Sequence, residues 1–352
     1  MLNDIDKETL VDLFISRITF LSFEEKKILK KNIDSSYDLA LLSIVDICKI
    51  INRDVKPKQW DSQENLRMAK ISQMACESLG IKILSYSHPD YPQKLLQIYN
   101  PPFVLFARGN VSILNNKSVS VVGTRRLSME GKEAAHQFAF QAAMDGCNVI
   151  SGLAVGADGF AHRGAIDAFY DAMEKSSSVE NLGKTIAVLP SSIDEIVPAG
   201  HKKLASQILQ TGGCILSEYE PKMNMATWHF VARNRIIAGM SDSTVVIQAP
   251  TGSGALITAD FALESGRDVM FHKVSLCENA KSFNKTVELQ LDKDLSQKKI
   301  SKYKRENTLE KYLEAGAPVI ENYIDFCKCL AENPGTRKTQ MDKQNQLSLF
   351  ES

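Results

Sequence analysis

The chain has 352 residues, of which 44% are hydrophobic and 24% charged, as is typical of a globular protein with several domains. Its 42 basic and 42 acidic residues cancel, so no overall charge favours nucleic acid or a membrane, and anion binding needs a local group of cations. The seven scattered cysteines, an acidic start and the lack of long apolar runs predict a cytoplasmic protein with reduced thiols, no signal peptide and no membrane span.

Residues 1–80 predict a small helical N-terminal domain. Ser22 followed by Glu25 has the spacing of a capping box that starts a helix, and segments 39–51 and 65–79 predict two further helices. We interpret this domain as a packing or partner-contact unit. The alternative, a helix-hairpin-helix contact to DNA, lacks a glycine hairpin that could hold a phosphate.

Residues 81–117 are broken by several prolines and predict an extended connector that leads into a sheet, with one strand at 103–106. Residues 273–330 predict a charged insertion, either on the surface or as a flexible arm, followed by a C-terminal helical segment. Residues 331–352 predict a flexible tail. Because the stretch after residue 318 is short for an unaided fold, we expect no winged helix at the C-terminus.

Between residues 118 and 272 short apolar runs alternate with helical patterns. The predicted strands are 118–122, 147–150, 184–189, 214–216, 243–248 and 268–271. The predicted helices are 128–145, 157–174, 201–210, 230–240 and 255–264. This alternation predicts an α/β fold with a Rossmann-like, mostly parallel sheet and helices on both faces. Because ligands bind such sheets at the carboxyl ends of the strands, we expect one site along that edge.

The first cluster of candidate residues follows the first strand of this domain. It consists of Gly123, Thr124, Arg125 and Arg126. A dinucleotide-binding fold would carry a second glycine where Arg125 stands, and an acidic residue where Ser151 and Gly152 stand. We therefore expect no nucleotide cofactor. An arginine beside the start of a helix suits an anion instead, while a purely structural arginine is the alternative.

A second cluster contains Asp158 and His162, which are four residues apart and fall on one helical face. Helix capping or packing and site lining both remain open for this pair. Two possible ligands without a third do not make a metal site, so no metal is predicted.

The third cluster is Phe230, Arg233, Asn234 and Arg235. Phe230 and Arg233 are neighbours on a helix, and an aromatic face beside guanidinium groups suits a nucleobase stacked next to its phosphate. In the alternative interpretation Phe230 belongs to the core and the arginines are solvated.

The fourth cluster, Ser253 and Gly254, lies between a predicted strand and a predicted helix. A glycine-serine loop at a helix start can bind an anion, and the lack of a following Lys-Ser or Lys-Thr pair excludes a Walker loop.

Taken in order, these segments resemble the bacterial DNA-processing protein A family, also called Smf. The matching blocks are VGTRR at 122–126, SGLAVGAD at 151–158, TIAVL at 185–189, LSE at 216–218, FVARNRIIAG at 230–239 and SGALIT at 253–258. The resemblance implies a Rossmann-like domain, a SAM-like N-terminal domain and a homodimer. It also implies a non-enzymatic protein that binds single-stranded DNA, loads the RecA recombinase and protects incoming DNA during natural transformation.

Carried over by motif, the resemblance makes the four clusters a DNA-binding site. Gly123, Thr124 and Arg125 would receive a phosphate, and Phe230 would stack a base with Arg233 nearby. The chain departs from many relatives after residue 271, where they have Val-Pro-Gly. An alternative function is a nucleotide-processing phosphoribohydrolase, because the segment from Gly254 to Glu264 resembles the glycine-rich loop and glutamate of those enzymes.

The tail carries a separate hypothesis. Gln346, Leu347, Leu349 and Phe350 resemble the pentapeptide by which bacterial proteins bind the replication sliding clamp. A tethered segment with two leucines and a phenylalanine suits a hydrophobic groove.

Overall fold

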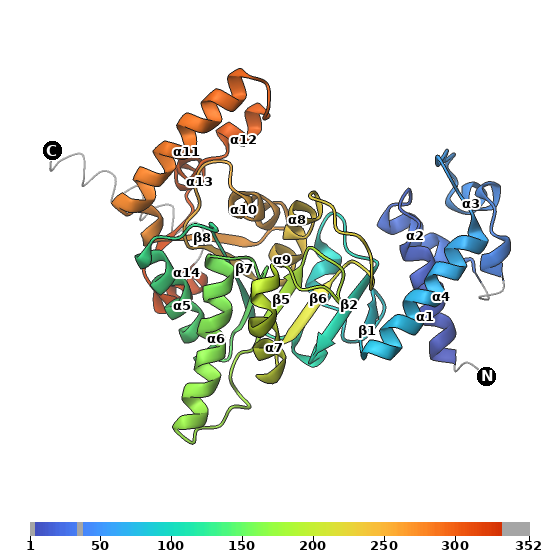
Figure 1. Ribbon diagram of the computed structural model, residues 1–352, viewed down its shortest axis with the longest axis horizontal. Helices are drawn as coiled ribbons and strands as arrows, with labels where there is room; N and C mark the ends of the chain where they lie inside the picture. The colour runs from blue at the N-terminus through green and yellow to red at the C-terminus, as the bar shows by residue number, and fades with distance from the viewer. Residues whose placement is uncertain (1–3, 34–37, 333–352) are drawn as a thin grey trace.

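The computed structural model describes residues 4–33 and 38–332 of the chain. Within them, one sheet has the strand order β1-β2-β6-β5-β4-β3-β7-β8-β9 (Figure 1). The strands are β1 (Lys82–Ser85), β2 (Val104–Gly109), β3 (Ser118–Val122), β4 (Asn148–Ser151), β5 (Thr185–Leu189), β6 (Cys214–Ser217), β7 (Ser243–Val246), β8 (Asp268–His272) and β9 (Val319–Ile320). Only the β1–β2 and β2–β6 pairs of this sheet are antiparallel, so the expected mostly parallel sheet is confirmed.

Strand β3 lies in the interior of the sheet, and the later strands are added on both sides of it. The chain first passes through β4 and β5 to β6, and then returns to place β7 on the other side of β3. The connecting helices are α5 (Met129–Met144), α6 (Ala157–Glu174), α7 (Lys202–Gln210) with the 3-10 turn η4 (Ala199–His201), α8 (His229–Ala232), α9 (Asn234–Met240) and α10 (Gly254–Glu264). The reversal of strand order between β3 and β7 opens a crevice at their carboxyl ends, which is where ligands bind in such sheets.

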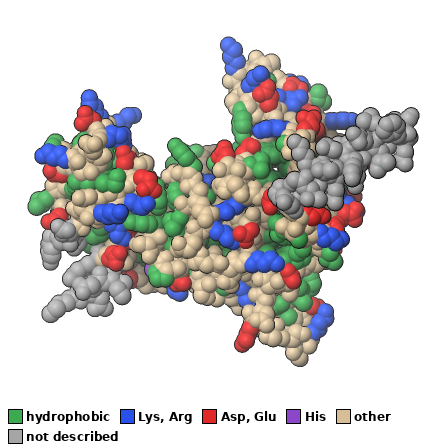
Figure 2. Space-filling model, turned by 180° about the vertical axis from the view of Figure 1, so that it is seen from behind, with side chains coloured by type: hydrophobic (Ala, Val, Ile, Leu, Met, Phe, Trp, Pro, Cys, Tyr) green, Lys and Arg blue, Asp and Glu red, His purple; other side chains and the backbone are tan. Residues whose placement is uncertain are grey.

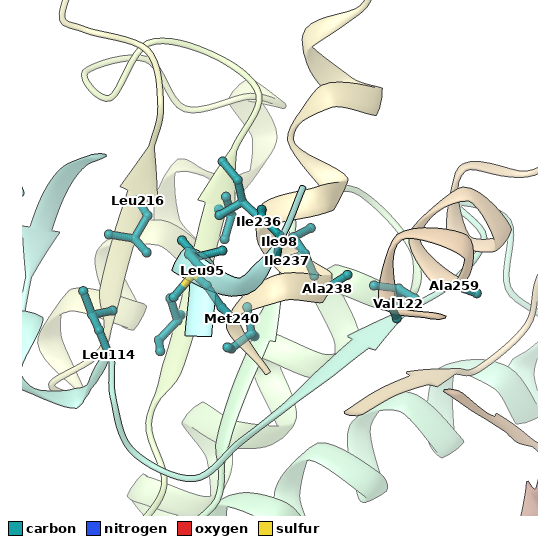
Figure 3. Close-up of a cluster of buried hydrophobic side chains, with 14 of the residues drawn as sticks. Leu95, Ile98, Leu114, Val122, Leu216, Ile236, Ile237, Ala238, Met240 and Ala259 are labelled. Atoms are coloured by element: carbon teal, nitrogen blue, oxygen red, sulfur yellow. The ribbon is translucent and has the colours of Figure 1, made fainter. Parts of the chain in front are cut away.

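Helices cover both faces of the sheet, as the continuous apolar strands predicted. On one face, Val119 and Val121 of β3 pack with Phe138 of α5. On the other face, Ile236 and Ile237 of α9 lie in a cluster with residues of β3, β6 and α10 (Figure 3). The Rossmann-like architecture is therefore confirmed, and α9 and α10 are the helices closest to the crevice.

The N-terminal region is helical, as expected. Its elements are α1 (Asp4–Ser16), α2 (Phe23–Lys31), the 3-10 turn η1 (Asp38–Leu41), α3 (Ile44–Ile51) and α4 (Ser62–Leu79). The predicted capping box is present, because the Ser22 side chain accepts the Glu25 amide and the Glu25 carboxylate accepts the Ser22 amide. Phe14 of α1 shares a buried cluster with Phe103 and Phe106, so these helices pack against the β2 side of the sheet.

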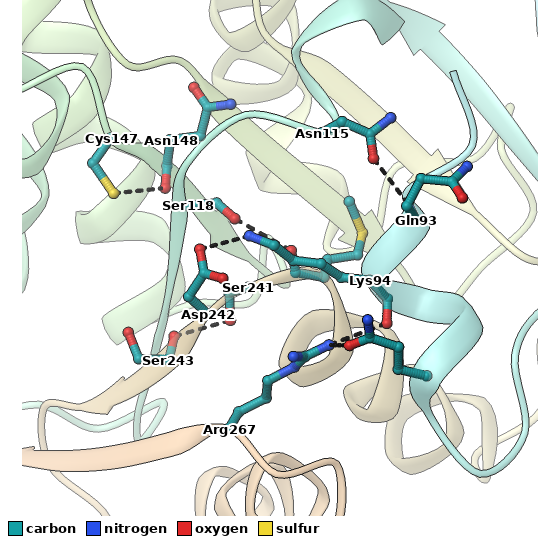
Figure 4. A network of polar contacts seen from close by, with 12 residues as sticks. Gln93, Lys94, Asn115, Ser118, Cys147, Asn148, Ser241, Asp242, Ser243 and Arg267 are labelled. Carbon is teal, nitrogen blue, oxygen red and sulfur yellow. Dashed lines mark hydrogen bonds and ion pairs between the residues drawn. The ribbon is translucent and has the colours of Figure 1, made fainter. Parts of the chain in front are cut away.

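The segment expected as an extended connector supplies two strands of the sheet itself. Residues 104–107 are fully buried, and β2 pairs along β6, which no local pattern could indicate. The 3-10 turns η2 (Gln93–Gln97) and η3 (Val111–Ile113) follow β1 and β2. Lys94 of η2 forms an ion pair with Asp242 at 2.5 Å (Figure 4). Arg267 donates to Gln97, the last residue of η2, at 2.7 Å. These contacts fix the connector to the starts of β7 and β8.

The charged segment after β8 forms helices rather than a flexible arm. It contains η5 (Lys273–Leu276), α11 (Glu278–Ser296) and α12 (Lys302–Glu306), and the chain ends its described part with α13 (Leu309–Glu314) and α14 (Tyr323–Ala331). Residues such as Glu, Gln, Leu and Lys favour helix, and Arg305 pairs with Asp292 at 2.6 Å. In Figure 1, α11 and α12 project from the sheet at the end opposite the N-terminal helices.

The surface carries mixed charge. On the face drawn in Figure 2, Lys and Arg side chains are interspersed with Asp and Glu side chains, in keeping with the zero net charge. In the part of the chain that the structure describes, no helix combines the length and the apolarity needed to cross a bilayer. The predicted clamp-binding residues 346–350 lie outside the described residues.

Candidate nucleic-acid interface

The carboxyl ends of β3, β4 and β7 and the start of α8 enclose a cavity of about 450 Å³, here called the first cavity. Ten of the residues singled out from the sequence lie on its wall: Gly123, Thr124, Arg125, Arg126, Asp158, Phe230, Arg233, Asn234, Ser253 and Gly254. Segments more than a hundred residues apart in the chain thus meet at the expected edge of the sheet. The sequence clusters form one site.

The rim of the first cavity consists of Arg125, Arg126 and Phe230. Both arginine side chains are exposed, and the Arg125 guanidinium lies 5.3 Å from the centre of the Phe230 ring. Phe230 is half-buried and belongs to none of the hydrophobic clusters of the described residues. The rim therefore offers cations and one aromatic face to a ligand.

The loop after β3 is held in place by its backbone. Thr124 donates its amide to the Gln248 carbonyl at 2.7 Å, and its own carbonyl accepts the Ala157 amide at 3.2 Å. A Cβ at Gly123 would lie 2.7 Å from the Ala157 Cβ, so only glycine permits this close approach of β3 to α6. Because the loop is bonded to both β7 and α6, Arg125 projects from a rigid base.

The start of α10 forms the opposite wall. Ser253 precedes the helix but makes no side-chain cap, and its buried hydroxyl has no hydrogen-bond partner within the described residues. Asn234 donates to the Gly254 carbonyl at 3.2 Å and so ties α9 to this turn. The first amides of a helix lack intrahelical acceptors and carry partial positive charge. This wall therefore suits an anion such as phosphate.

The floor of the site consists of Asp158 and Arg233, which are both buried. Asp158 accepts the amides of Gly152 at 3.1 Å and Ala154 at 3.3 Å. Burial raises the pKa of the Asp158 carboxyl, and the nearby positive charge of Arg233 opposes that shift. Burial also lowers the pKa of Arg233 to about 10, so the guanidinium stays charged at neutral pH.

Arg233 serves the loop after β4 rather than the open part of the cavity. Its Nη1 donates to the Gly152 carbonyl at 2.7 Å and also to the Val188 carbonyl. A Cβ at Gly152 would lie 2.1 Å from that nitrogen, so glycine makes room for the arginine. Ser151 donates its hydroxyl to the Val121 carbonyl at 2.6 Å. Neither Ser151 nor Gly152 is on the cavity wall, although both were predicted as site residues.

Arg235 is also directed away from the first cavity. Its guanidinium lies 2.6 Å from Glu218 and donates to the carbonyls of Asn100 at 2.9 Å and Ala232 at 3.1 Å. The structure therefore separates the arginines of the motif: Arg233 supports the floor, Arg235 joins α9 to β6, and the exposed cations come from the loop after β3.

His162 lies on the buried face of α6, one turn after Asp158. Its Nδ1 is 2.7 Å from the Thr185 hydroxyl, which itself donates to the Val149 carbonyl, so Nδ1 carries the proton. Burial, with smaller effects from His201, Arg163 and Arg233, lowers the pKa of His162 to about 3. His162 is absent from the cavity wall. The sequence left two roles open for His162, packing and lining of the site. The structure shows that His162 is a packing residue.

Two features of the structure concern the alternative that the protein is an enzyme: the position of Glu264 and the arrangement of possible metal ligands. Glu264 stands at the far end of α10, about 15 Å from Gly254 at 1.5 Å per residue, and so cannot meet a sugar bound at the start of that helix. Among residues 4–33 and 38–332, no group of three or more His, Cys, Asp or Glu side chains is placed to hold a metal ion.

One wall residue was not anticipated from the sequence. Phe283 of α11 lines the first cavity, although it comes from the charged segment that was read as a surface insertion or arm. The available signal was a lone aromatic residue in a polar helix. Its place on the wall of the first cavity depends on how α11 packs, which the local sequence does not reveal.

Comparisons with known proteins agree with this geometry. The model of the family described as DNA recombination-mediator protein A matches residues 82–289. The chain is 31% identical to Protein Smf of Borreliella burgdorferi over 271 residues, which are 75% of this chain and 79% of that protein. It is 34% identical to DNA processing protein DprA of Streptococcus pneumoniae over 245 residues, which are 69% of this chain and 79% of that protein.

A solved structure gives the same relationship across nearly the whole fold. The X-ray structure of DNA processing protein A from Streptococcus pneumoniae superposes with a TM-score of 0.64 at 25% identity, covering 91% of this chain and 96% of that one. The residues that the family model matches, 82–289, include every strand from β1 to β8 and all four clusters of the site. The chain belongs to the DNA recombination-mediator protein A family, whose relatives are named Smf or DNA processing protein DprA.

Proposed function

We propose that the first cavity binds single-stranded DNA. The observation that carries this proposal is the pairing of Arg125 with Phe230 at 5.3 Å, opposite the start of α10. Proteins that bind single strands combine cations that follow the backbone with aromatic faces on which bases stack. Arg125 and the α10 amides supply the first element, and Phe230 supplies the second.

The aromatic face favours a single strand over a duplex. A base can stack on a side chain only when it is unpaired and turned out of a helix. The whole chain has no net charge, so a duplex would gain little from long-range attraction. The affinity would instead come from the few cations of the rim and from stacking.

Membership of the family extends the proposal from DNA binding to the role of the protein in the cell. The protein is a non-enzymatic, cytoplasmic recombination mediator that works without a cofactor and loads the RecA recombinase onto the bound strand as a homodimer, in natural transformation or general recombination. The family description and the relatives named for DNA processing support this part. A contact of Gln346, Leu347, Leu349 and Phe350 with the sliding clamp stays a prediction from the sequence alone.

Arg125→Ala tests the proposal most directly. Binding of a fluorescent oligo-dT, followed by anisotropy at several salt concentrations, should weaken markedly. The slope of log K against log salt should become shallower by about 0.7, the value for one lost phosphate contact on a single strand.

Arg67→Ala is the matched control, because Arg67 is an exposed arginine on α4, far from the crevice. It removes the same charge and should change neither affinity nor slope beyond the small effect of net charge. If Arg125→Ala and Arg67→Ala bind oligo-dT alike, the first cavity is not the DNA site.

A further inference from the structure

The first cavity adjoins a second one of about 410 Å³, here called the second cavity. The second cavity lies between the start of α5, the end of β7 and the first turns of α11. Three residues line both cavities: Thr124, Arg126 and Phe283. The two cavities therefore share a boundary at these three residues.

Phe283 resembles Phe230 in its burial and in its place on the wall of the first cavity. It is half-buried, yet it belongs to none of the hydrophobic clusters and has no aromatic partner among the described residues. Burial in the core does not account for an aromatic residue in a helix as polar as α11. Its ring faces the two cavities instead.

The start of α11 is fixed relative to the site. Thr251, in the loop after β7, donates its amide to Asn284 at 2.7 Å and its hydroxyl to Glu288 at 2.8 Å. Asn279 donates to Glu130, on the first turn of α5, at 3.2 Å. Phe283 lies between these contacts, so its ring is held over the loops that form the cavity walls.

Helices α11 and α12, here called the α11–α12 projection, are also bonded to the site through α12 and the residue that follows it. Asn307 accepts the Gly252 amide at 2.8 Å and donates its side chain to Asp260 of α10 at 2.8 Å. Tyr303 of α12 also donates to Asp260. The α11–α12 projection is thus bonded to the same loop and helix that form one wall of the first cavity.

The charges of the two cavities differ. The second cavity has Arg126 and Lys281 on its wall, balanced by Glu130 and Glu310. It therefore attracts a phosphate less than the first cavity does. Its apolar side chains, with the amides of neighbouring polar residues, suit a nucleobase.

We propose that Phe283 is a second base-stacking residue and that the second cavity receives the base of the nucleotide adjacent to the one whose phosphate lies at Arg125. This inference rests on the proposed function and extends it from one nucleotide to a track of two. The α11–α12 projection is then part of the DNA site rather than a surface addition.

The test compares two ligands of equal length and charge, oligo-dT and an abasic oligonucleotide, in anisotropy titrations of the full chain. Phe283→Ala should weaken binding of oligo-dT about five- to hundredfold, the range for one lost base stack, and leave the abasic ligand and the salt slope unchanged. Phe283→Leu, which keeps the apolar bulk, should show the same selective loss. Phe283→Tyr should restore binding because it keeps the aromatic face.

Leu289→Ala is the matched control, because Leu289 lies on the same helix, is 65% exposed and lines neither cavity. The inference is overturned if Phe283→Leu binds oligo-dT like wild type, or if it weakens both ligands equally. A wild-type chain that fails to bind oligo-dT at all would instead refute the proposed function, and this inference with it. Binding that depends on Arg125 but not on Phe283 would refute the inference alone.

Discussion

The rim and the floor of the first cavity use the same residue types for different purposes. Arg125 on the rim is exposed and lies against an aromatic ring, whereas Arg233 on the floor is 5% exposed and donates to backbone carbonyls. Both are arginines in sequence motifs of the family. Burial, rather than residue type, separates the side chain that can meet a ligand from the one that shapes the loops.

The electrostatics of the two regions follow from this difference. The rim cations are solvated, so their energy depends on salt and on the ligand. The floor holds Asp158 and Arg233 away from water, where each compensates the desolvation of the other. We therefore expect changes on the floor to alter stability and changes on the rim to alter binding.

The largest effect is expected from Arg233→Met, which keeps the bulk of the side chain and removes its charge. Asp158 would remain buried without its counter-charge, and the carbonyls of Gly152 and Val188 would lose their donor. Leaving a buried acceptor without its donor costs about 1–3 kcal/mol for each carbonyl. Urea unfolding should show this loss of the free energy of unfolding.

Two further variants sharpen this result. Arg126→Ala removes an exposed rim arginine and should stay within about 0.5 kcal/mol of wild type. Adding Asp158→Asn to Arg233→Met should recover part of the loss, because the second change removes the stranded charge. Equal stability of Arg233→Met and wild type would mean that the floor arginine does not support the loops.

The next largest effect is expected on DNA binding, from removal of the aromatic ring on the rim. Phe230→Ala should weaken oligo-dT binding by about 1–3 kcal/mol through loss of one stacked base, with little change in salt slope. The unfolding midpoint should hardly move, since Phe230 belongs to none of the hydrophobic clusters. Phe230→Tyr, which retains the ring, is the control. Lower stability with unchanged affinity would make Phe230 a packing residue instead.

Much of the sheet could be predicted because its strands are locally encoded. β3 occupies 118–122 as expected, since a continuous apolar run between polar segments has few other interpretations. The strand predicted at 103–106 matches β2, but its place in the sheet could not be predicted, because β2 pairs with β6, which is distant in sequence. Strand β1, which pairs with β2, was not predicted. A local sequence pattern therefore predicts individual strands well, but it predicts poorly which strands pair with one another.

The site was predictable to a similar degree. The edge of the sheet and the rim residues followed from topology and motif, and the first cavity gathers them as expected. The burial of Arg233, the outward pairing of Arg235 with Glu218 and the approach of Phe283 all depend on tertiary packing. A sequence motif therefore predicts where a site lies more reliably than it predicts the role of each residue in the motif.

The smallest effect tests the buried face of α6, on which His162 lies one turn after Asp158. Burial lowers the pKa of His162 from 6.5 to about 3, so the folded state favours the neutral ring, whereas the unfolded chain binds a proton below about pH 6.5. This contribution to stability is complete above pH 6.5 and is lost progressively as pH falls toward 3.

Between pH 7.5 and 5.5 the loss from His162 amounts to about 1.4 kcal/mol, since one proton is taken up by the unfolded chain over one pH unit of that interval. His162→Gln, which can still donate to Thr185, should lack this loss, while other histidines contribute equally to both proteins. The raised pKa of Asp158 acts in the opposite sense, but Asp158 is present in both proteins, so its contribution cancels in the comparison. Urea unfolding of both proteins at the two pH values measures the difference. Parallel pH profiles would mean that His162 is protonated in the folded state, and this face of α6 would then be more accessible to water than the burial of His162 indicates.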